Sequence, residues 1–386
     1  MKYYLVAGEA SGDLHGANLI KGLKLLDGNA EFRCWGGDLM AAEGAHLVKH
    51  YKESAIMGFV EVLANIRKIG RNLKECKHDI INYSPDVLIL IDYPGFNLRI
   101  AEFAKERGIK VFYYIAPKVW AWKEKRVHKL KKFVDRLFII FPFEIEYFKK
   151  WGIDAIYKGN PLLDSVDNYP SATESKELFC KRYNLNANLP IIALLAGSRR
   201  NEITYLLPRM AEVVKQYPNY QFIIAGAPSI EEDLYKSVLA KSGIENLSGR
   251  IRLIKGETYS ILRHARAAII SSGTASLEAA LIGTPQVVCY GGNEISYRIA
   301  KKLVKLKYIS LANLIMNKQL FKELIQHECT PEFIIKELNR LTGDEDYRKE
   351  MMNNYALVRE VLGGKGASAK VAGAMIEELG KLQNIN

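Results

Sequence analysis

The sequence is poor in cysteine and has no paired cysteine motif. Its 386 residues contain five cysteines and no Cys-x-x-Cys spacing; they are Cys34, Cys76, Cys180, Cys289 and Cys329. An odd number of widely separated cysteines is typical of free thiols in a reducing compartment. The pattern argues against a disulfide framework and against a cysteine zinc site.

Long apolar runs are also missing. No uninterrupted apolar stretch approaches the ~18–20 residues of a membrane-spanning helix. The apolar run that follows Lys2 ends at Val6 and is too short for the core of a signal peptide. We therefore expect a cytoplasmic protein, unless something holds it at a membrane surface.

Several motifs of nucleotide and metal chemistry are absent. There is no Walker loop, no Gly-x-Ser-x-Gly, and no Gly-x-Gly-x-x-Gly, which disfavours a dinucleotide-dependent oxidoreductase. His46 and His50 are four residues apart, but no acidic residue completes a His-Glu-x-x-His zinc motif. Asp344-Glu345-Asp346 has the Asp-x-Asp form of metal-dependent sugar transferases, but it precedes a charged helical segment and predicts a helix N-cap. We expect no metal and no cofactor.

What is present is the pattern of a globular α/β protein, 48% hydrophobic and 25% charged. Short apolar runs alternate with helix-length segments, which is typical of parallel sheets buried on both faces. Expected strands in the first part are Lys2–Val6, Val87–Ile91, Val111–Ile115, Leu137–Phe141 and Ala155–Lys158. Those in the second part are Ile191–Leu195, Gln221–Ala225, Ile251–Ile254, Ala267–Ser271 and Gln286–Tyr290.

The two series of strands predict two Rossmann-like domains facing across a cleft. We expect a first domain over residues 1–165 and a second over residues 166–364, with the seam in residues 164–190. The tail from Glu332 to Leu382 has no strand pattern, and residues 365–386 are expected to form a last helix that packs back on the first domain. Ligands of doubly wound folds bind at the carboxyl ends of the strands, so the loops there are the candidate sites.

Two such loops lie in the first domain. The loop after the first strand is either a tight turn or a ligand loop, whose candidate residues are Gly8, Glu9, Ser11, Gly12 and His15. Asp92 ends the strand Val87–Ile91 in Asp92-Tyr93-Pro94-Gly95-Phe96-Asn97. Its carboxylate either caps the next helix or accepts a proton from an attacking hydroxyl.

Two further loops lie in the second domain. Ser198 and Arg199 follow one strand and suit a diphosphate. After another strand, Gly273, Thr274 and Ser276 form a turn and helix start that can bind phosphate, and Glu278 can accept hydrogen bonds from ribose hydroxyls. Either turn alone is as compatible with a structural role. Together they favour a nucleotide diphosphate.

The net charge of +12 admits an anionic partner, and its distribution favours a membrane surface. Residues 58–76 predict an amphipathic helix, with Phe59 and Leu63 in its apolar stripe and Arg67, Lys68, Arg71 and Lys74 on other faces. The alternative is a surface helix whose stripe lies in the core. Residues 120–133 and 297–307 are similarly basic. No nucleic-acid recognition module is visible, so no nucleic-acid partner is expected.

The motifs in order resemble those of the lipid-A-disaccharide synthase family. They are residues 7–13, 113–122, 141–144, 197–199 and 272–278, and the Pro117-Lys118-Val119-Trp120-Ala121-Trp122 stretch is especially specific. The resemblance implies a GT-B fold and a metal-independent inverting transfer, at the cytoplasmic face of the inner membrane. In that reaction UDP-2,3-diacylglucosamine and 2,3-diacylglucosamine 1-phosphate give a β(1→6) disaccharide and UDP.

The resemblance also implies roles for single residues. Asp92 matches the catalytic base, and Arg199 and Glu278 match residues of the UDP site. Asn313 and Gln326 match positions used near the donor. Asn160 departs from the family, which commonly has His there. The implied partners are an acylated UDP-sugar, an acylated sugar phosphate and an anionic membrane surface.

Other functions remain as alternatives. The nearest are another GT-B transferase, such as a peptidoglycan glucosaminyltransferase, and a UDP-sugar epimerase of similar architecture. The tryptophan stretch and the Asp92 motif speak against both. A non-enzymatic lipid-binding protein would not need Asp92, Arg199 and Glu278 at equivalent strand ends.

Overall fold

The computed structural model describes residues 1–54, 66–120, 124–171, 173–243, 249–292 and 307–383. The chain divides into two compact units, one of residues 1–164 with 362–386 and one of residues 165–361. Each unit has its own parallel sheet. The chain passes from the first unit to the second within helix α9 (Pro161–Asp167).

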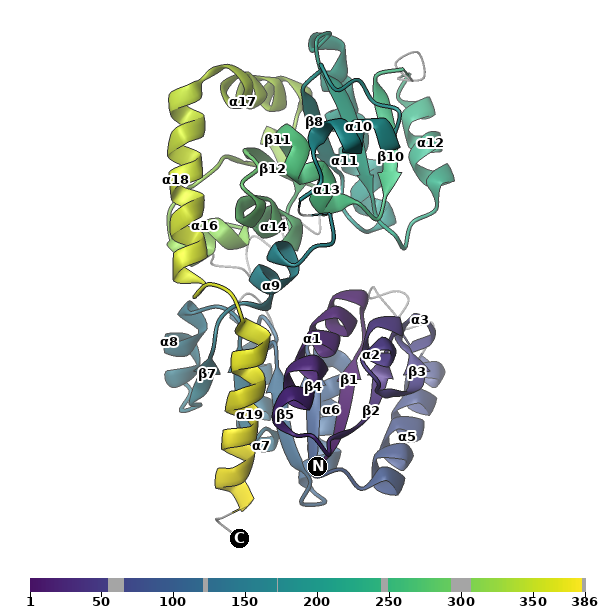
Figure 1. Cartoon of the computed structure of the whole chain (residues 1–386), viewed down its shortest axis with the longest axis vertical. Helices are drawn as coiled ribbons and strands as arrows, with labels where there is room; N and C mark the ends of the chain where they lie inside the picture. The colour runs from purple at the N-terminus through teal and green to yellow at the C-terminus, as the bar shows by residue number, and fades with distance from the viewer. Residues whose placement is uncertain (55–65, 121–123, 172, 244–248, 293–306, 384–386) are drawn as a thin grey trace. The chain divides into compact units, whose positions relative to one another are not determined.

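The first unit is a seven-stranded parallel sheet in the order β3-β2-β1-β4-β5-β6-β7 (Figure 1). Its strands are β1 (Lys2–Ala7), β2 (Glu31–Gly36), β3 (His46–His50), β4 (Val87–Ile91), β5 (Lys110–Tyr114), β6 (Arg136–Ile139) and β7 (Ala155–Tyr157). Its helices are α1 (Ala10–Leu26), α2 (Asp38–Ala42), α3 (Tyr51–Ser54), α5 (Ile66–Tyr83), α6 (Pro94–Lys105), η1 (Glu124–Arg126), α7 (Val127–Phe133), α8 (Phe143–Lys149) and α19 (Ala367–Gln383). The central strand β4 is completely buried because helices cover both faces of the sheet.

Helix α19 belongs to the first unit and packs against α1 (Figure 1). The two helices approach closely at Gly22, where a Cβ atom would meet Ala372 and the backbone of Ser368 and Ala369. The side chain of Glu378 pairs with Arg136 on β6. At the start of α19, Asp164 accepts hydrogen bonds from the backbone N–H groups of Gly366 (2.6 Å) and Ser368 (2.9 Å).

The second unit is a six-stranded parallel sheet in the order β10-β9-β8-β11-β12-β13. Its strands are β8 (Ile191–Leu195), β9 (Gln221–Gly226), β10 (Ile251–Lys255), β11 (Ala265–Ser271), β12 (Gln286–Tyr290) and β13 (Glu323–Ile325). Its helices are α10 (Lys176–Arg182), α11 (Arg200–Glu212), η2 (Val213–Gln216), α12 (Glu232–Lys241), α13 (Thr258–His264), α14 (Thr274–Ile282), α16 (Leu311–Met316), η4 (Gln326–Glu328), α17 (Pro331–Gly343) and α18 (Glu345–Val361). Helices α13 and α14 pack together against the sheet, as do α11 and α17.

All ten predicted strands are present, with ends that shift by one or two residues. The strands β2, β3 and β13 were not predicted. Strand β2 carries Arg33, whose charge interrupts the apolar run and is paired in the structure with Asp79 at 2.6 Å. Strand β13 is three residues long and begins with Glu323, whose charge leaves no apolar run. The helical tail after Glu332 is confirmed by α17, α18 and α19.

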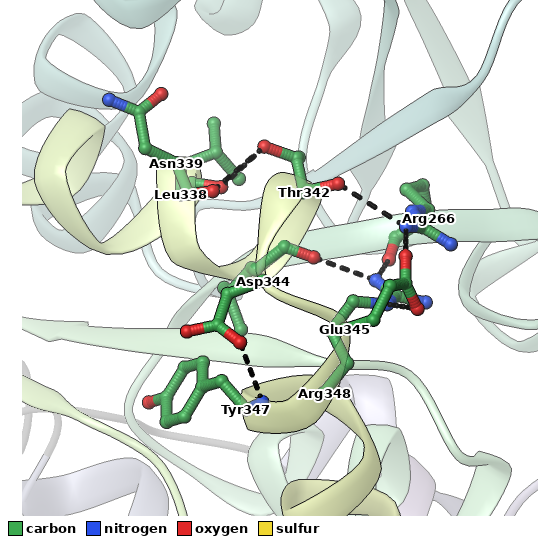
Figure 2. Close-up of polar contacts among 9 residues, drawn as sticks. Arg266, Leu338, Asn339, Thr342, Asp344, Glu345, Tyr347 and Arg348 are labelled. Atoms are coloured by element: carbon green, nitrogen blue, oxygen red, sulfur yellow. Dashed lines mark hydrogen bonds and ion pairs between the residues drawn. The ribbon is translucent and has the colours of Figure 1, made fainter.

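The Asp344-Glu345-Asp346 motif caps a helix, as predicted. Figure 2 shows the Asp344 carboxylate accepting a hydrogen bond from the backbone N–H of Tyr347 at 2.9 Å, at the start of α18. Glu345 forms an ion pair with Arg266, which also donates to the carbonyl of Thr342 at 3.2 Å. Through these contacts, the residues of the motif connect α17, α18 and β11.

Within the described residues, no helix is both long enough and apolar enough to cross a membrane. The expected amphipathic helix at residues 58–76 is α5 from Ile66 onward, and its first part lies outside the described residues.

Candidate functional site

Asp92 lies at the carboxyl end of β4 on an unusual backbone. Asp92 and Tyr93 both adopt left-handed conformations, with φ of 43° and 48°, directly before α6 begins at Pro94. Non-glycine residues rarely occupy this region, and strain of this kind is found mainly where the fold holds a functional group in place. The backbone N–H of Asp92 donates to the carbonyl of Tyr114 on β5 at 3.0 Å.

Two buried polar side chains hold this turn. The Asn97 amide donates to the carbonyls of Asp92 (2.9 Å), Ile91 (3.2 Å) and Val6 (3.3 Å), which ties the ends of β1 and β4 together. The Tyr113 hydroxyl donates to the same Asp92 carbonyl at 2.5 Å. The sequence motif that begins at Asp92 includes Asn97 but does not predict its contacts. The contacts of Asn97 and Tyr113 depend on chain segments that are distant in sequence.

The Asp92 carboxyl group is electrostatically suited to accept a proton. Burial and, to a smaller extent, the nearby Glu9 carboxylate raise its pKa to about 6, while Lys118 and the Tyr93 N–H act in the opposite direction. A base of this pKa is mostly ionised at neutral pH and is a stronger proton acceptor than an ordinary aspartate. The N-cap residue of α6 is Tyr93 and not Asp92, and its side chain forms no capping hydrogen bond.

The loop after β1 is shorter than predicted. Gly8 is buried where a Cβ atom would collide with the Tyr93 ring, so only glycine fits beside the Asp92 turn. Helix α1 begins at Ala10, and therefore Ser11, Gly12 and His15 are helical rather than in a loop. Glu9 and Ser11 are exposed at the strand end.

His15 does not fit the predicted substrate loop. Its side chain is buried in the packing of α1, and desolvation lowers its pKa to about 4, so the imidazole is neutral. Gly12 packs closely on Ala7. Of the five candidate residues of this segment, Glu9 and Ser11 are exposed, and Gly8, Gly12 and His15 are buried.

The tryptophan stretch follows β5, the neighbour of the strand that ends before Asp92, and its described residues include the buried Pro117 and Val119 and the half-buried Trp120. Trp120 donates from Nε1 to Glu144 Oε1 at 2.9 Å and packs edge-on against Phe143. Glu144 also accepts from the backbone N–H groups of Phe141 (3.1 Å) and Ile140 (3.3 Å). Burial raises the pKa of Glu144 to about 7, although these donors and Lys118 favour the ionised form. The predicted Trp122 lies outside the described residues.

In the second unit, Ser198 and Arg199 form an open turn between β8 and α11. Gly197 has φ of 106°, a conformation that glycine adopts readily. Glu202 accepts from the Ser198 N–H at 3.1 Å and pairs with Arg199 at 2.7 Å. The Arg199 side chain is 67% exposed, so its guanidinium can exchange this neighbour for an anionic ligand.

The turn after β11 presents the N-terminus of α14. Gly273 and Thr274 are exposed, and the Ser276 hydroxyl donates to the Gly273 carbonyl at 2.8 Å. The exposed N–H groups of this helix end suit a phosphate. Glu278 accepts from Tyr259 at 3.0 Å, and burial raises the pKa of its carboxyl group.

Asn313 and Gln326 are engaged in internal hydrogen bonds. The Asn313 amide donates to Glu323 (2.8 Å) and Phe321 (3.1 Å) and accepts from the Leu320 N–H at 2.8 Å. Gln326 exchanges two hydrogen bonds with the backbone of Gly292, at 2.9 and 3.2 Å. Asn313 therefore holds the segment that leads into β13, and Gln326 joins the loops that follow β12 and β13.

The predicted membrane helix is only partly described. Phe59 and Leu63 lie outside the described residues. Arg67, Arg71 and Lys74 are exposed on α5, and Lys68 is half-buried. Farther along α5, Leu73 packs against the core of the first unit, so this part of the apolar stripe is structural.

The candidate residues gather at one edge of each sheet. In the first unit, the segments that follow the adjacent strands β1, β4, β5 and β6 carry Glu9, Asp92, Lys118 and Glu144. In the second unit, the segments that follow the adjacent strands β8, β11, β12 and β13 carry Arg199, Gly273, Gly292 and Gln326. Ligands of parallel α/β sheets bind at this edge. No cluster of three or more metal-binding side chains occurs among the residues that were described.

Solved structures with a similar fold include UDP-N-acetylglucosamine 2-epimerases and a glycosyltransferase. A UDP-N-acetylglucosamine 2-epimerase from Rickettsia bellii matches with a TM-score of 0.66 and 14% identity, over 99% of this chain and 98% of that chain. A glycosyltransferase from Rickettsia africae matches with a TM-score of 0.61 and 14% identity, over 98% of both chains. These identities show the fold alone, and the two parallel α/β sheets agree with the expected GT-B class.

Sequence relatives specify the family. The lipid-A-disaccharide synthetase family model matches residues 3–372. Lipid-A-disaccharide synthase of Geobacter metallireducens is 39% identical over 98% of this chain and 97% of its own. That of Myxococcus xanthus is 37% identical over 97% of both. The chain belongs to the lipid-A-disaccharide synthase family.

Proposed function

We propose that the strand ends of the first unit hold the sugar acceptor, with Asp92 as general base, and that those of the second unit hold the UDP-sugar donor. As a member of its family the protein is a hexosyltransferase of lipid A biosynthesis. It joins UDP-2,3-diacylglucosamine to 2,3-diacylglucosamine 1-phosphate, which gives the β(1→6) disaccharide 1-phosphate and UDP. The proposal concerns which residues perform this reaction and which parts of the substrates they recognise.

The first step assigned to the chain's own residues is proton removal. The acceptor's 6-hydroxyl is a weak nucleophile at neutral pH, and Asp92 accepts its proton as the oxygen attacks the anomeric carbon of the donor. The bond from that carbon to the UDP oxygen breaks on the opposite face, so the configuration inverts. The observation that carries this assignment is the partly buried carboxyl group of Asp92, fixed on a strained turn with a raised pKa.

The second step is the departure of UDP, which gains negative charge as the bond breaks. Arg199 and the N–H groups at the start of α14, over Gly273–Ser276, are placed to bind the diphosphate. Glu278 is assigned to the ribose hydroxyls. Asn313 and Gln326 are assigned to the loops that shape this site, since their amides already bind the backbone or Glu323. These groups take the part that a divalent metal has in other transferases.

We also propose that the protein works as a peripheral enzyme at the cytoplasmic face of the inner membrane. Both substrates carry acyl chains, so the reacting sugars lie at a bilayer surface. The exposed cations Arg67, Arg71 and Lys74 on α5 suit an anionic headgroup layer. The proposal assigns the acceptor and membrane side to the first unit and the donor side to the second.

The deciding experiment uses the purified protein with diacylated donor and acceptor, scored for UDP and for the disaccharide. UDP release that requires the acceptor is the expected result. Donors of the N-acetylglucosamine type without acyl chains, run in parallel, should be poor substrates. Conversion of the UDP-sugar to an epimer without acceptor would instead support the epimerase alternative and overturn the transferase assignment.

A further inference from the structure

Lys118 is an exposed cation in an otherwise buried loop of the first unit. The loop leaves β5 through Ile115, whose φ is 62° and whose N–H donates to the Phe138 carbonyl of β6 at 3.0 Å. Its neighbours Pro117 and Val119 are buried, whereas the Lys118 side chain is exposed. Two residues later, the hydrogen bond from Trp120 to Glu144 anchors the far end of the loop. The fold thus fixes the backbone that carries this ammonium group.

The surroundings of Lys118 are acidic. Its ammonium group acts electrostatically on both Asp92 and Glu144, and Glu9 lies close enough to Asp92 to act on it as well. Nevertheless, no hydrogen bond or ion pair joins Lys118 to another residue of the described chain. A lysine beside carboxylates that binds none of them directly keeps its three N–H donors for a ligand.

We propose that Lys118 binds the phosphate group of the acceptor sugar while Asp92 receives the proton of its 6-hydroxyl. The inference rests on the proposed function, since it concerns how the acceptor lies at the Asp92 site. Glu9, Asp92 and Glu144 would repel a sugar phosphate, and Lys118 is the cation whose field reaches Asp92. In a sugar 1-phosphate the phosphate and the 6-hydroxyl lie on either side of the ring oxygen, a few ångströms apart. Asp92 directly follows β4, and Lys118 lies in the loop that follows the adjacent strand β5, so both residues belong to the same edge of the sheet.

In the same proposal, Glu144 holds the loop that carries Lys118. Glu144 does not reach the substrate in this scheme. It is a positioning residue, because it binds Trp120 and two backbone N–H groups of the β6 turn and so holds the Lys118 loop.

The test compares two acceptors and three proteins. The acceptors are the diacylated glucosamine with and without its 1-phosphate, and the proteins are wild type, Lys118→Gln and Lys118→Arg. Lys118→Gln should raise KM for the phosphorylated acceptor about 10–100-fold, the size of a lost charge-assisted hydrogen bond, and leave KM for the other acceptor nearly unchanged. Lys118→Arg should keep most of the discrimination. Lys21→Gln, at an exposed position of α1, is the matched control.

Two results would overturn the proposal. Equal losses with both acceptors would mean that Lys118 acts only through the pKa of Asp92, and an unchanged KM for the phosphorylated acceptor would exclude any contact. Binding of each acceptor without donor, measured by calorimetry, separates this question from turnover. Weaker binding of the phosphorylated acceptor to Lys118→Gln supports the contact even if no disaccharide forms, whereas equal binding to both proteins removes it. Absence of transfer by wild type would count against the proposed function alone.

Discussion

The two strand-end regions that carry the candidate residues are built in opposite ways. In the first unit, Asp92 lies on a strained turn, its carbonyl accepts hydrogen bonds from Asn97 and Tyr113, and its side chain is partly buried. In the second unit, the Arg199 side chain is 67% exposed, and its guanidinium pairs with Glu202. The N-terminus of α14 is open as well.

The difference agrees with the roles proposed for the two regions, a general base in the first unit and a diphosphate site in the second. A general base needs a raised pKa and a fixed position, and both require burial and rigid support. A group that binds a diphosphate must be reachable and must exchange its partner for the ligand. The comparison therefore assigns chemistry to the first unit and donor binding to the second, and the following changes test it.

The largest effect is expected from Asp92→Asn. The amide keeps the size of the side chain but cannot accept the proton, so kcat should fall about 10²–10⁴-fold with little change in UDP affinity. Steady-state kinetics and UDP titration measure the two quantities. Asp86→Asn, at the opposite end of β4, is the control and should keep its turnover. Near-normal turnover of Asp92→Asn would remove the base from the first unit.

Arg199→Ala should act on the donor instead. Loss of a charge-assisted contact to the diphosphate should raise KM for the UDP-sugar about 10–100-fold and leave KM for the acceptor unchanged. Glu202→Gln is the counterpart, because it releases Arg199 from its ion pair without removing the guanidinium. It should preserve donor binding. A donor KM that Arg199→Ala does not change would show that the exposed arginine is not part of the site.

The pH dependence of kcat/KM tests the role of Asp92 in the first unit. The base must be ionised, and its pKa is raised to about 6, so kcat/KM should rise through pH 6 and be level above it. Below that midpoint it should fall about tenfold per pH unit. Circular dichroism over the same range shows whether the fold persists. A profile that stays flat down to pH 5 in folded protein would contradict the raised pKa.

The membrane assignment predicts a smaller effect for each residue changed. Replacing Arg67, Lys68, Arg71 and Lys74 of α5 by Ser should weaken binding to anionic vesicles by up to about 1 kcal/mol, or about fivefold, for each engaged charge. Added NaCl should weaken wild-type binding similarly, since surface charges are screened within about 8–10 Å at physiological salt. Vesicle sedimentation measures both.

A companion change separates the interface from the core. Phe59→Ser with Leu63→Ser should reduce only vesicle binding if these side chains enter the interface, and should lower thermal stability if they lie in the core. Unchanged vesicle binding by the folded four-Ser protein would remove α5 from the membrane site and leave the basic segment 297–307 as the next candidate.

Much of the fold could be predicted because its strands are continuously apolar. Val87–Ile91 and Ile191–Leu195 are buried on both faces, and such strands have clear limits in the sequence. Strand β2 was missed because Arg33 is tolerated there only through Asp79, which lies on α5 far along the chain. The pairing of distant residues is not visible in a local pattern.

The residues of the candidate site also divide into those that a local sequence pattern predicts and those that it does not. Asp92 and Arg199 were found because each directly follows a buried strand. Glu202 and Tyr113 were not, since their roles depend on which atoms the folded backbone brings near them. His15 shows the converse error: its place in a glycine-rich segment suggested a ligand loop, but helix α1 starts early enough to turn it into the core.

Removal of divalent cations should have no effect on activity, and this prediction concerns the donor region. If Arg199 and the start of α14 neutralise the charge that develops on UDP, transfer needs no divalent cation. Activity should therefore be the same in excess EDTA as in buffer, measured as initial rates of UDP release on vesicle-bound substrates. The comparison with Arg199→Ala makes the test stronger, because a site that has lost its cation could regain activity from added magnesium, while wild type should not respond. Complete loss of wild-type activity in EDTA, restored by magnesium or manganese, would show that the exposed groups of the second unit do not suffice and that the donor is bound through a metal.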